Sequence, residues 1–349
     1  MSTRVNERRR HSLIGRPGKP PMGTAPQPAT SLGCADLISI RDLMPAEVRA
    51  ILDLARLMKV RAADFSRALA GKQLVLFFEK PSLRTRLTFE AGINSLGGTS
   101  FFVDHTRSRI DEREKLSDIA RNLERWVDGV VLRTFDHATV VEMAEHARIP
   151  VINGLSDLEH PCQALADFLT LEEKFEDLSR IRLAYVGDGN NVAHSLMLVA
   201  ACLGSHMRVA TPIGYEPDAA IVASAVATAT VTGGSIQLFS DPVQAVTGAT
   251  AVYTDVWASM GHEGEAETRR QRFQPYQVNQ ELMACAEPGA CFMHCLPAHR
   301  GEETTDAMLD SPQSIVFDQA ENRLHVQKAI LLLLLGGGMR RSPPRSAHA

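Results

Sequence analysis

The sequence predicts an α/β protein with two doubly wound parallel-sheet domains, joined by interdomain helices and separated by a substrate cleft. Short apolar runs typical of buried strands alternate with segments of helical spacing, and this alternation favours parallel sheets covered by helices on both faces. The runs are too numerous for one open sheet, and a chain of 349 residues is long enough for two domains. Polar residues follow several of the strands, where the loops of such sheets bind ligands.

Apolar runs define the expected strands. They lie at 74–78, 99–103, 129–133, 149–152, 182–186, 206–210, 236–239, 251–254, 291–294 and 314–317. Between them, apolar residues recur at helical spacing, and the first such helix opens at Pro45. The other expected helices lie at 116–126, 138–147, 161–175, 190–203, 216–231 and 321–336.

We expect the domain boundary at the long linking helix 161–175. The first domain then spans 34–160 and is completed by the last helix, 321–336, and the second spans 161–320. The ends of the chain, 1–33 and 337–349, contain Pro, Gly and Arg and lack apolar periodicity. Such composition cannot bury enough apolar surface to fold, so we expect a disordered N-terminal tail and a flexible C-terminal one.

Composition argues against several classes of partner. The formal net charge of −4 gives no general positive field for nucleic acid. The longest apolar run near the end, 329–335, is far too short to span a bilayer, so no membrane partner is expected. Six cysteines are few for this length, which favours a reducing compartment and a cytoplasmic location. The Arg-rich N-terminal tail leaves organelle targeting as the alternative.

One short stretch, Ser82-Leu83-Arg84-Thr85-Arg86, has the composition of an anion site. It follows the strand 74–78, and Pro81 disfavours helix before Ser82. A helix that starts there offers free backbone N–H groups and its positive dipole end, and the hydroxyl and guanidinium groups add donors. The stretch therefore predicts a phosphate site, although a solvated helix start with a serine cap fits it equally well.

Two further polar positions lie at element ends. Arg133 ends the strand 129–133, and His160 precedes Pro161, which is a favourable first helical residue. A neutral His160 can donate to a carbonyl oxygen, and Gln163 in the next turn can accept from an amide N–H group. A surface ion pair and a helix cap are the alternative readings of these residues.

Cofactor motifs are weak. The segment 187–191 invites comparison with a dinucleotide fingerprint, but Val192 stands where the third glycine belongs, which counts against a nicotinamide dehydrogenase. Asn191 instead offers an amide to the cleft. Zinc at Cys291 and neighbouring residues is discounted, because no second ligand pair with finger spacing exists. We therefore expect no metal and no organic cofactor.

The remaining candidates follow the strands 251–254 and 291–294, or lie in the last helix. Asp255 could bind an amine, and Ser259 with the Met260 backbone could hold a carboxylate, unless this loop only ends in glycine and packs on the core. Cys295 is a potential nucleophile or a polarisable wall, and no unambiguous base stands beside it. Arg323 belongs to a polar cluster that, taken alone, is typical of a capped surface.

Together these stretches resemble the aspartate/ornithine transcarbamylase family, and within it most closely the ornithine enzymes. The resemblance runs from about residue 36 to 335, with four motifs in the expected order. They are Ser82-Leu83-Arg84-Thr85-Arg86, His160-Pro161-Cys162-Gln163, Asp255-Val256-Trp257-Ala258-Ser259-Met260-Gly261 and His294-Cys295-Leu296-Pro297. Two positions depart from the pattern: Leu83 replaces a threonine, and Arg109 stands where Gln or His is common.

The resemblance implies transfer of a carbamoyl group from carbamoyl phosphate to the δ-amine of L-ornithine, giving L-citrulline and phosphate in arginine metabolism. It implies a homotrimer or a multiple of trimers, in which a neighbouring subunit contributes the loop that contains Arg109. The first domain would bind carbamoyl phosphate and the second ornithine. Within the family, an enzyme acting on N-acetylornithine, N-succinylornithine, putrescine or aspartate is the alternative, and outside it a non-catalytic binding protein.

The resemblance also assigns roles to residues. Binding of carbamoyl phosphate falls to Ser82, Leu83, Arg84, Thr85, Arg86, Arg109, Arg133, His160, Gln163, Cys295, Leu296 and Arg323. Binding of ornithine falls to Asn191, Asp255, Ser259 and Met260. The residues expected to take part in catalysis are Arg133, His160, Asp255 and Cys295.

Overall fold

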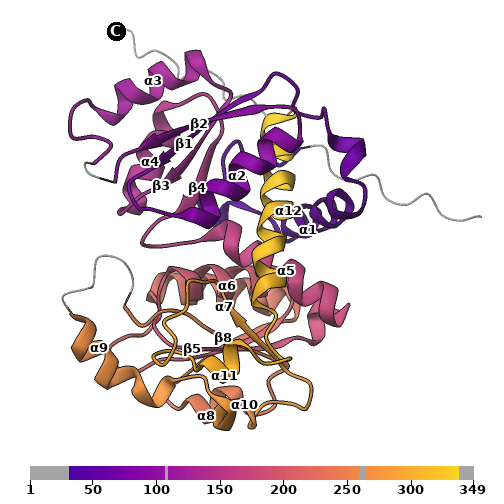
Figure 1. Ribbon diagram of the computed structural model, residues 1–349, viewed down its shortest axis with the longest axis vertical. Helices are drawn as coiled ribbons and strands as arrows, with labels where there is room; N and C mark the ends of the chain where they lie inside the picture. Colours follow the sequence, from indigo (N-terminus) through magenta and orange to yellow (C-terminus); the bar gives the residue numbers. More distant parts are fainter. Residues whose placement is uncertain (1–30, 107–108, 259–264, 338–349) are drawn as a thin grey trace, which may run out of the picture.

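Two parallel sheets, each with helices on both faces, form the protein (Figure 1). The computed structural model describes residues 31–106, 109–258 and 265–337. The first sheet has the strand order β2-β1-β3-β4 and the second β7-β6-β5-β8-β9, and every pairing in both is parallel. The predicted fold class is confirmed.

In the first domain, strand residues point alternately to two helical layers. The strands are β1 (Gln73–Phe78), β2 (Thr99–Asp104), β3 (Gly129–Arg133) and β4 (Val151–Leu155). Val75 and Phe77 of β1 pack with α3 (Leu116–Trp126) and α4 (His137–His146). Leu74, Leu76 and Phe78 face the opposite side, towards α1 (Pro45–Val60) and α2 (Leu83–Ser95). Because helices cover both faces, the central strands β1 and β3 are apolar over residues 74–78 and 129–132.

The second domain repeats the plan. Its strands are β5 (Arg182–Val186), β6 (His206–Ala210), β7 (Ser235–Phe239), β8 (Ala251–Thr254) and β9 (Cys291–His294). Its longer helices are α6 (Asn191–Leu203), α7 (Ala219–Thr232) and α9 (Ala266–Phe273). α6 and α7 cover one face of the sheet, and the shorter helices α8 (Pro242–Val246), α10 (Gln280–Met283) and α11 (Asp306–Leu309) cover the other, on whose side α9 also lies.

Two long helices connect the domains (Figure 1). Helix α5 (Pro161–Phe175) is buried over its first twelve residues, and α12 (Val316–Leu335) packs against α5, α1 and α2. α12 begins beside β9 of the second sheet and ends where Leu335 meets Gly129 in the first. Apolar side chains of both domains and both helices form one continuous core.

Two expectations about the chain were wrong. The apolar run 314–317 is no strand, because Ser314 makes only an isolated bridge to Phe292 and α12 begins at Val316, five residues before the expected start. A short apolar run cannot by itself distinguish a strand from the first turn of a buried helix. The N-terminal tail is shorter than expected, because Leu32 is buried in the core, while residues 1–30 and 338–349 lie outside the described residues.

No helix in the described ranges is both long enough and apolar enough to cross a membrane.

Replacing Phe168 by alanine should destabilise the protein, because its ring is fully buried in the core that α5 shares with both domains. Truncating a buried phenylalanine costs about 3–5 kcal/mol, which should lower the urea midpoint clearly. Phe317→Ala is the matched control: this side chain is 75% exposed on α12, and its loss should change stability by less than about 0.5 kcal/mol. Equal shifts for the two variants would contradict the placement of the core.

Candidate active site

A cavity of about 360 Å³ lies where the carboxyl ends of strands from both sheets face each other. Strand ends β3, β8 and β9, the starts of helices α2, α5 and α6, and the middle of α12 contribute side chains to it. This is the position at which open parallel sheets bind ligands. Twelve predicted site residues line it: Ser82, Leu83, Arg84, Thr85, Arg133, His160, Gln163, Asn191, Asp255, Cys295, Leu296 and Arg323.

At one end of the cavity, α2 begins with a side-chain cap. The hydroxyl of Ser82 accepts the backbone N–H of Thr85 at 3.2 Å, and helix starts at Leu83 as the sequence predicted. The N–H groups of the first helical residues have no partner within the helix, so they and the positive dipole end are available to an anion. Leu83 is 72% exposed, so its side chain lies at the mouth of the cavity.

Three residues that line the cavity each carry a buried nitrogen atom without a partner in the described part of the chain. Arg133 Nε, His160 Nδ1 and Arg323 Nε are all buried and have no hydrogen-bond partner among the described residues. Arg323 uses another nitrogen, Nη2, to donate to the hydroxyl of Thr85 at 2.6 Å. Buried polar groups are normally paired, so unpaired groups that line a cavity indicate the place of a ligand.

Electrostatics fixes the charge of these groups. Burial, and then the neighbouring Arg323, lowers the pKa of Arg133 to about 9, so Arg133 stays cationic at neutral pH. Burial, with repulsion from Arg323 and Arg133, holds the pKa of His160 well below its usual value. His160 is therefore a neutral imidazole, which can donate a hydrogen bond but adds no charge. Both arginines favour an anionic ligand.

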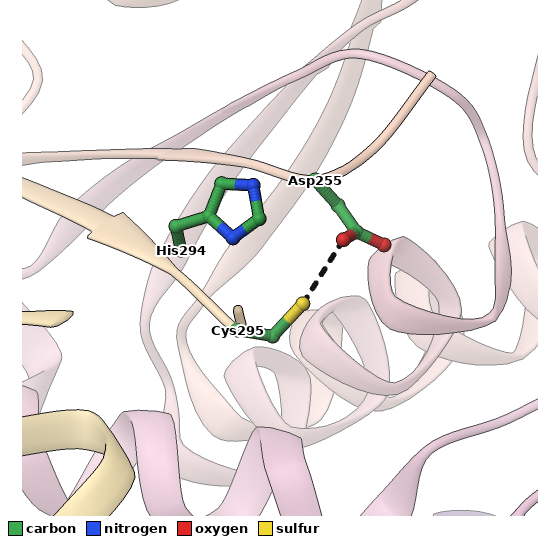
Figure 2. A group of neighbouring side chains, drawn as sticks. All are labelled: Asp255, His294 and Cys295. Atoms are coloured by element: carbon green, nitrogen blue, oxygen red, sulfur yellow. Dashed lines mark hydrogen bonds between the residues drawn. The ribbon is translucent and has the colours of Figure 1, made fainter. Parts of the chain in front are cut away.

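The opposite end of the cavity is acidic. The thiol of Cys295 donates to Asp255 Oδ1 at 3.0 Å (Figure 2). The amide of Asn190 donates to Asp255 Oδ2 at 2.8 Å. Burial, and then the negative charge of Asp255, raises the pKa of Cys295 well above its usual range. Cys295 is thus a neutral thiol. This argues against a role as nucleophile and favours a role as a lining residue that orients a substrate.

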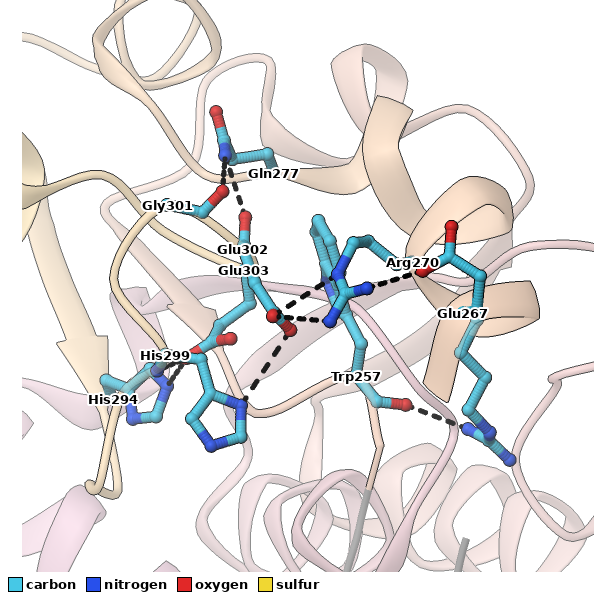
Figure 3. Close-up of polar contacts among 10 residues, drawn as sticks. Trp257, Glu267, Arg270, Gln277, His294, His299, Gly301, Glu302 and Glu303 are labelled. Carbon is cyan, nitrogen blue, oxygen red and sulfur yellow. Dashed lines mark hydrogen bonds and ion pairs between the residues drawn. The ribbon is translucent and has the colours of Figure 1, made fainter. Parts of the chain in front are cut away.

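Next to this end, a buried histidine and glutamate fix the loop that carries Cys295. His294 Nδ1 accepts the N–H of Leu296 at 2.8 Å. Its Nε2 lies 3.1 Å from Glu303 Oε1 (Figure 3). The same glutamate oxygen accepts the N–H of His299 at 2.5 Å. Leu296 has a φ of 57°, a conformation that non-glycine residues seldom adopt and that clusters at functional sites.

Side chains from α9 and the segment after it support the outer part of this loop (Figure 3). Arg270 pairs with Glu302 at 3.0 Å, and Gln277 donates to the carbonyls of Gly301 and Glu302 at 3.2 and 2.8 Å.

Asp255, His294 and Cys295 lie close enough together to suggest a metal site. Both ring nitrogens of His294 already make hydrogen bonds, however, so the ring has no free lone pair to offer a metal.

Two ionisable residues that line the cavity were not assigned to the site by the sequence reasoning, Lys80 and His299. Lys80 is 6% exposed with its Nζ 4.7 Å from the Phe135 ring centroid, and burial followed by Arg133 lowers its pKa. Its position between the end of β1 and the Ser82 cap could have identified Lys80 as a site residue, because loops at this edge of the sheet bind ligands. His299 lies in the loop after β9, a second position where a polar residue follows a strand.

Among the described residues, Arg86 and Arg109 do not line the cavity. Arg86 donates to Glu90 at 2.9 Å and its guanidinium stacks 3.8 Å from the Phe102 ring centroid, so its side chain is engaged outside the cavity. A residue two positions after Arg84 lies well round the helix from it, which explains the difference. Arg109 pairs with Asp136 on the surface. Ser259 and Met260 lie outside the described residues.

Comparisons with known proteins agree with this geometry. Residues 35–173 match the model of the aspartate/ornithine carbamoyltransferase carbamoyl-P binding domain, and residues 179–334 match that of the Asp/Orn binding domain. An ornithine carbamoyltransferase of Symbiobacterium thermophilum is 55% identical over 308 residues, which are 88% of this chain and 99% of the relative. The anabolic ornithine carbamoyltransferase of Pyrococcus furiosus is 50% identical over 88% of this chain and 98% of its own length.

Solved structures show the same likeness. The ornithine carbamoyltransferase structure from Pyrococcus furiosus superposes with a TM-score of 0.84 at 50% identity and covers 86% of this chain and 97% of its own. A structure of N-acetyl-L-ornithine transcarbamylase is more distant, with a TM-score of 0.77 at 32% identity, covering 86% of this chain and 99% of its own. The chain belongs to the aspartate/ornithine carbamoyltransferase family.

Proposed function

We propose that the chain is an ornithine carbamoyltransferase, which transfers the carbamoyl group of carbamoyl phosphate to the δ-amine of L-ornithine and releases L-citrulline and phosphate. The observation that carries the proposal is the charge separation within one cavity. Unpaired cationic and neutral donors at Arg133, His160 and Arg323 lie towards one end, and the Asp255–Cys295 pair lies at the other. The names of the relatives point to the same activity.

The phosphate of carbamoyl phosphate binds at the start of α2 in this proposal. The N–H groups of the first turn, the hydroxyl of Ser82 and the guanidinium of Arg84 surround that end of the cavity. At position 83 the backbone N–H must suffice, because leucine has no hydroxyl. These donors neutralise a dianion, and the helix dipole adds to their effect.

The carbonyl oxygen of the carbamoyl group faces Arg133, His160 and Thr85. Because Thr85 already accepts from Arg323, its hydroxyl proton is free to donate towards the cavity. These donors are fixed before the reaction and strengthen as the oxygen becomes negative in the tetrahedral intermediate, which lowers the barrier. Gln163 and the carbonyl of Leu296 accept the hydrogens of the carbamoyl N–H₂ group.

The amino acid binds on the side of the second domain. Asn191 and Asp255, with Ser259 and Met260, hold the α-amino and α-carboxylate groups. Asp255 and Cys295 orient the δ-amine as it loses its proton, which it must do because an ammonium has no lone pair for attack. The first proton goes to solvent, and the neutral nitrogen then bonds to the carbonyl carbon. The bond from that carbon to the phosphate oxygen breaks, and the leaving phosphate takes the second proton from the attacking nitrogen.

The proposal also covers the oligomeric state, the metabolic role and the cellular compartment. The chain acts as a homotrimer or a multiple of trimers, with the loop around Arg109 reaching the site of a neighbouring subunit. Arg109 is half-exposed, pairs with the surface residue Asp136 and lies 5.5 Å from the Phe135 ring centroid. The enzyme serves arginine biosynthesis, as the name of its anabolic relative suggests, and works in the cytoplasm. The six cysteines are free, as a reducing compartment requires.

Purified protein should form citrulline from carbamoyl phosphate and L-ornithine in a buffer that contains a metal chelator. L-ornithine should be preferred over N-acetyl-L-ornithine, N-succinyl-L-ornithine and putrescine by at least about a hundredfold in kcat/KM, because a site built for a charged α-amino group loses its pairing with the others. A colorimetric citrulline assay, with phosphate release for the other amines, measures this. Turnover of an acylated ornithine or putrescine in place of ornithine would refute the substrate assignment.

Arg84→Ala should weaken carbamoyl phosphate binding by about ten- to a hundredfold, the cost of one charge-assisted contact to a dianion. Isothermal calorimetry measures the dissociation constant directly. Arg86→Ala is the matched control, because its side chain is engaged by Glu90 and Phe102 outside the cavity; we expect a change within about threefold, the level of an exposed ion pair. Unchanged affinity in Arg84→Ala would remove the phosphate from the start of α2.

Cys295→Ala should raise the KM for ornithine or lower kcat, since it removes the thiol that holds Asp255 in place. The dissociation constant of carbamoyl phosphate should stay within about twofold, because an uncharged contact at the far end of the cavity contributes little to it. Cys202→Ala, a partly buried cysteine of α6 outside the cavity, serves as control and should leave both constants unchanged. The opposite pattern, with carbamoyl phosphate affected more, would move Cys295 away from the amino-acid side.

A further inference from the structure

Beneath Gln163 lies a buried carboxylate that the proposed reaction does not use. Asp167, four residues later on α5, is fully buried and outside the cavity lining. Its Oδ1 accepts from Gln163 Nε2 at 2.8 Å and from Gln319 Nε2 at 2.9 Å. Its Oδ2 accepts from the hydroxyl of Tyr253 at 3.0 Å. Asp167 thus gathers donors from α5, α12 and β8 directly behind a residue of the site.

This arrangement decides which end of the Gln163 amide faces the ligand. An ionised carboxylate only accepts hydrogen bonds, so the N–H₂ end of Gln163 must point at Asp167. Its oxygen, Oε1, is then the end left over, and it is buried without a partner among the described residues. Burial raises the pKa of Asp167 to about 6, while the three hydrogen bonds oppose that rise, so the group is ionised at pH 8.

A second, independent constraint acts through Gln319. The backbone N–H of His294 donates to Gln319 Oε1 at 3.0 Å, and a backbone N–H cannot reverse its polarity. Gln319 must therefore turn its N–H₂ group towards Asp167, so position 167 has to present an acceptor. The direction of every hydrogen bond from His294 to Gln163 follows from this one backbone donor.

We propose that Asp167 and Gln319 are positioning residues that hold the oxygen of the Gln163 amide towards the cavity, and that this polarity makes the site select a carbamoyl group over an acetyl group of the same shape. The inference rests on the proposed function, since it concerns the carbamoyl end of the same site. A carbamoyl N–H₂ donates to Oε1. A methyl group cannot, and it leaves a buried acceptor unpaired.

Two stable phosphonates test the selection. Phosphonoacetamide and 2-oxopropylphosphonate both place a carbonyl beside a dianion and differ only in an amino group against a methyl group. Calorimetry on the full-length protein at pH 8 should show about tenfold or greater preference of the wild type for the amide, the usual effect of one unpaired buried group.

The variants separate polarity from packing. Asp167→Asn should keep the preference, because Gln319 still demands an acceptor and the hydroxyl of Tyr253 can accept from the new amide. Gln319→Met should also keep it, because the carboxylate of Asp167 alone still fixes Gln163. Only in the double variant Asp167→Asn/Gln319→Met can the side-chain amides at positions 167 and 163 both reverse. Its preference for phosphonoacetamide should fall to about twofold, because phosphonoacetamide binds more weakly while the affinity for 2-oxopropylphosphonate is unchanged.

Tyr253→Phe is the matched control, because it removes a donor from the other oxygen of Asp167 and should leave the preference unchanged. If the double variant does not fold, Asp167→Ala, which removes the acceptor, should lower the same ratio. An unchanged ratio in the double variant, or an equal loss for both ligands, would overturn the inference. A wild type that binds both ligands alike would refute it and leave the proposed function standing, whereas a wild type that binds neither would refute both.

Discussion

The packing of α12 between α1, α2 and α5 is the constraint on which the rest of the site depends. The helix is buried over most of its length, and it runs from β9 of the second domain to the start of β3 in the first domain. Arg323 in its middle donates to Thr85, which lies 238 positions earlier in the chain. Because side chains at such separation meet only through tertiary packing, the apolar face of α12 determines where a cation of the active site lies.

Burial gives these cations their effect. Arg133 and Arg323 repel each other in a region from which water is largely excluded, and the same field keeps His160 neutral. The surrounding core must offset this repulsion while the cavity holds no anion, and a dianionic ligand relieves it. At the other end of the cavity, the proton on Cys295 and the amide of Asn190 both point at Asp255. The two ends are therefore complementary to an anionic and a cationic substrate, held face to face.

Buried hydrogen-bond networks then specify the orientation of side chains around the site. His294 and Glu303, both fully buried, set the course of the loop through Leu296, and the backbone of His294 determines the direction of the hydrogen bonds that reach Gln163 through Gln319. Reversing the Gln163 amide would set its oxygen against the carboxylate of Asp167, and reversing Gln319 would set its N–H₂ group against the backbone N–H of His294. The cost of either reversal is what makes one arrangement unique.

The sequence by itself determined most strands, several helix starts and the chemical character of the residues at strand and helix ends. The β5, β6, β8 and β9 spans were predicted to the residue, because buried parallel strands are unbroken apolar runs bounded by turns. Most of the site residues could be named in advance, since they are polar residues at the end of an element or within a recognisable motif: the Ser82 cap, Arg133, His160, Gln163, Asp255 and Cys295. Arg323 could be named only through the polar cluster to which it belongs and the family resemblance.

Only the tertiary structure decided which of these groups meet and how they are oriented. It turned Arg86 away towards Glu90 and Phe102, brought in Lys80, and made a helix of the run after Ser314. It also placed Asp167 and Gln319 behind the site, although nothing in their local sequence distinguishes them from other buried helix residues. Local sequence restricts the backbone of a few neighbouring residues, whereas side-chain direction, charge and hydrogen-bond polarity depend on contacts made across the whole chain.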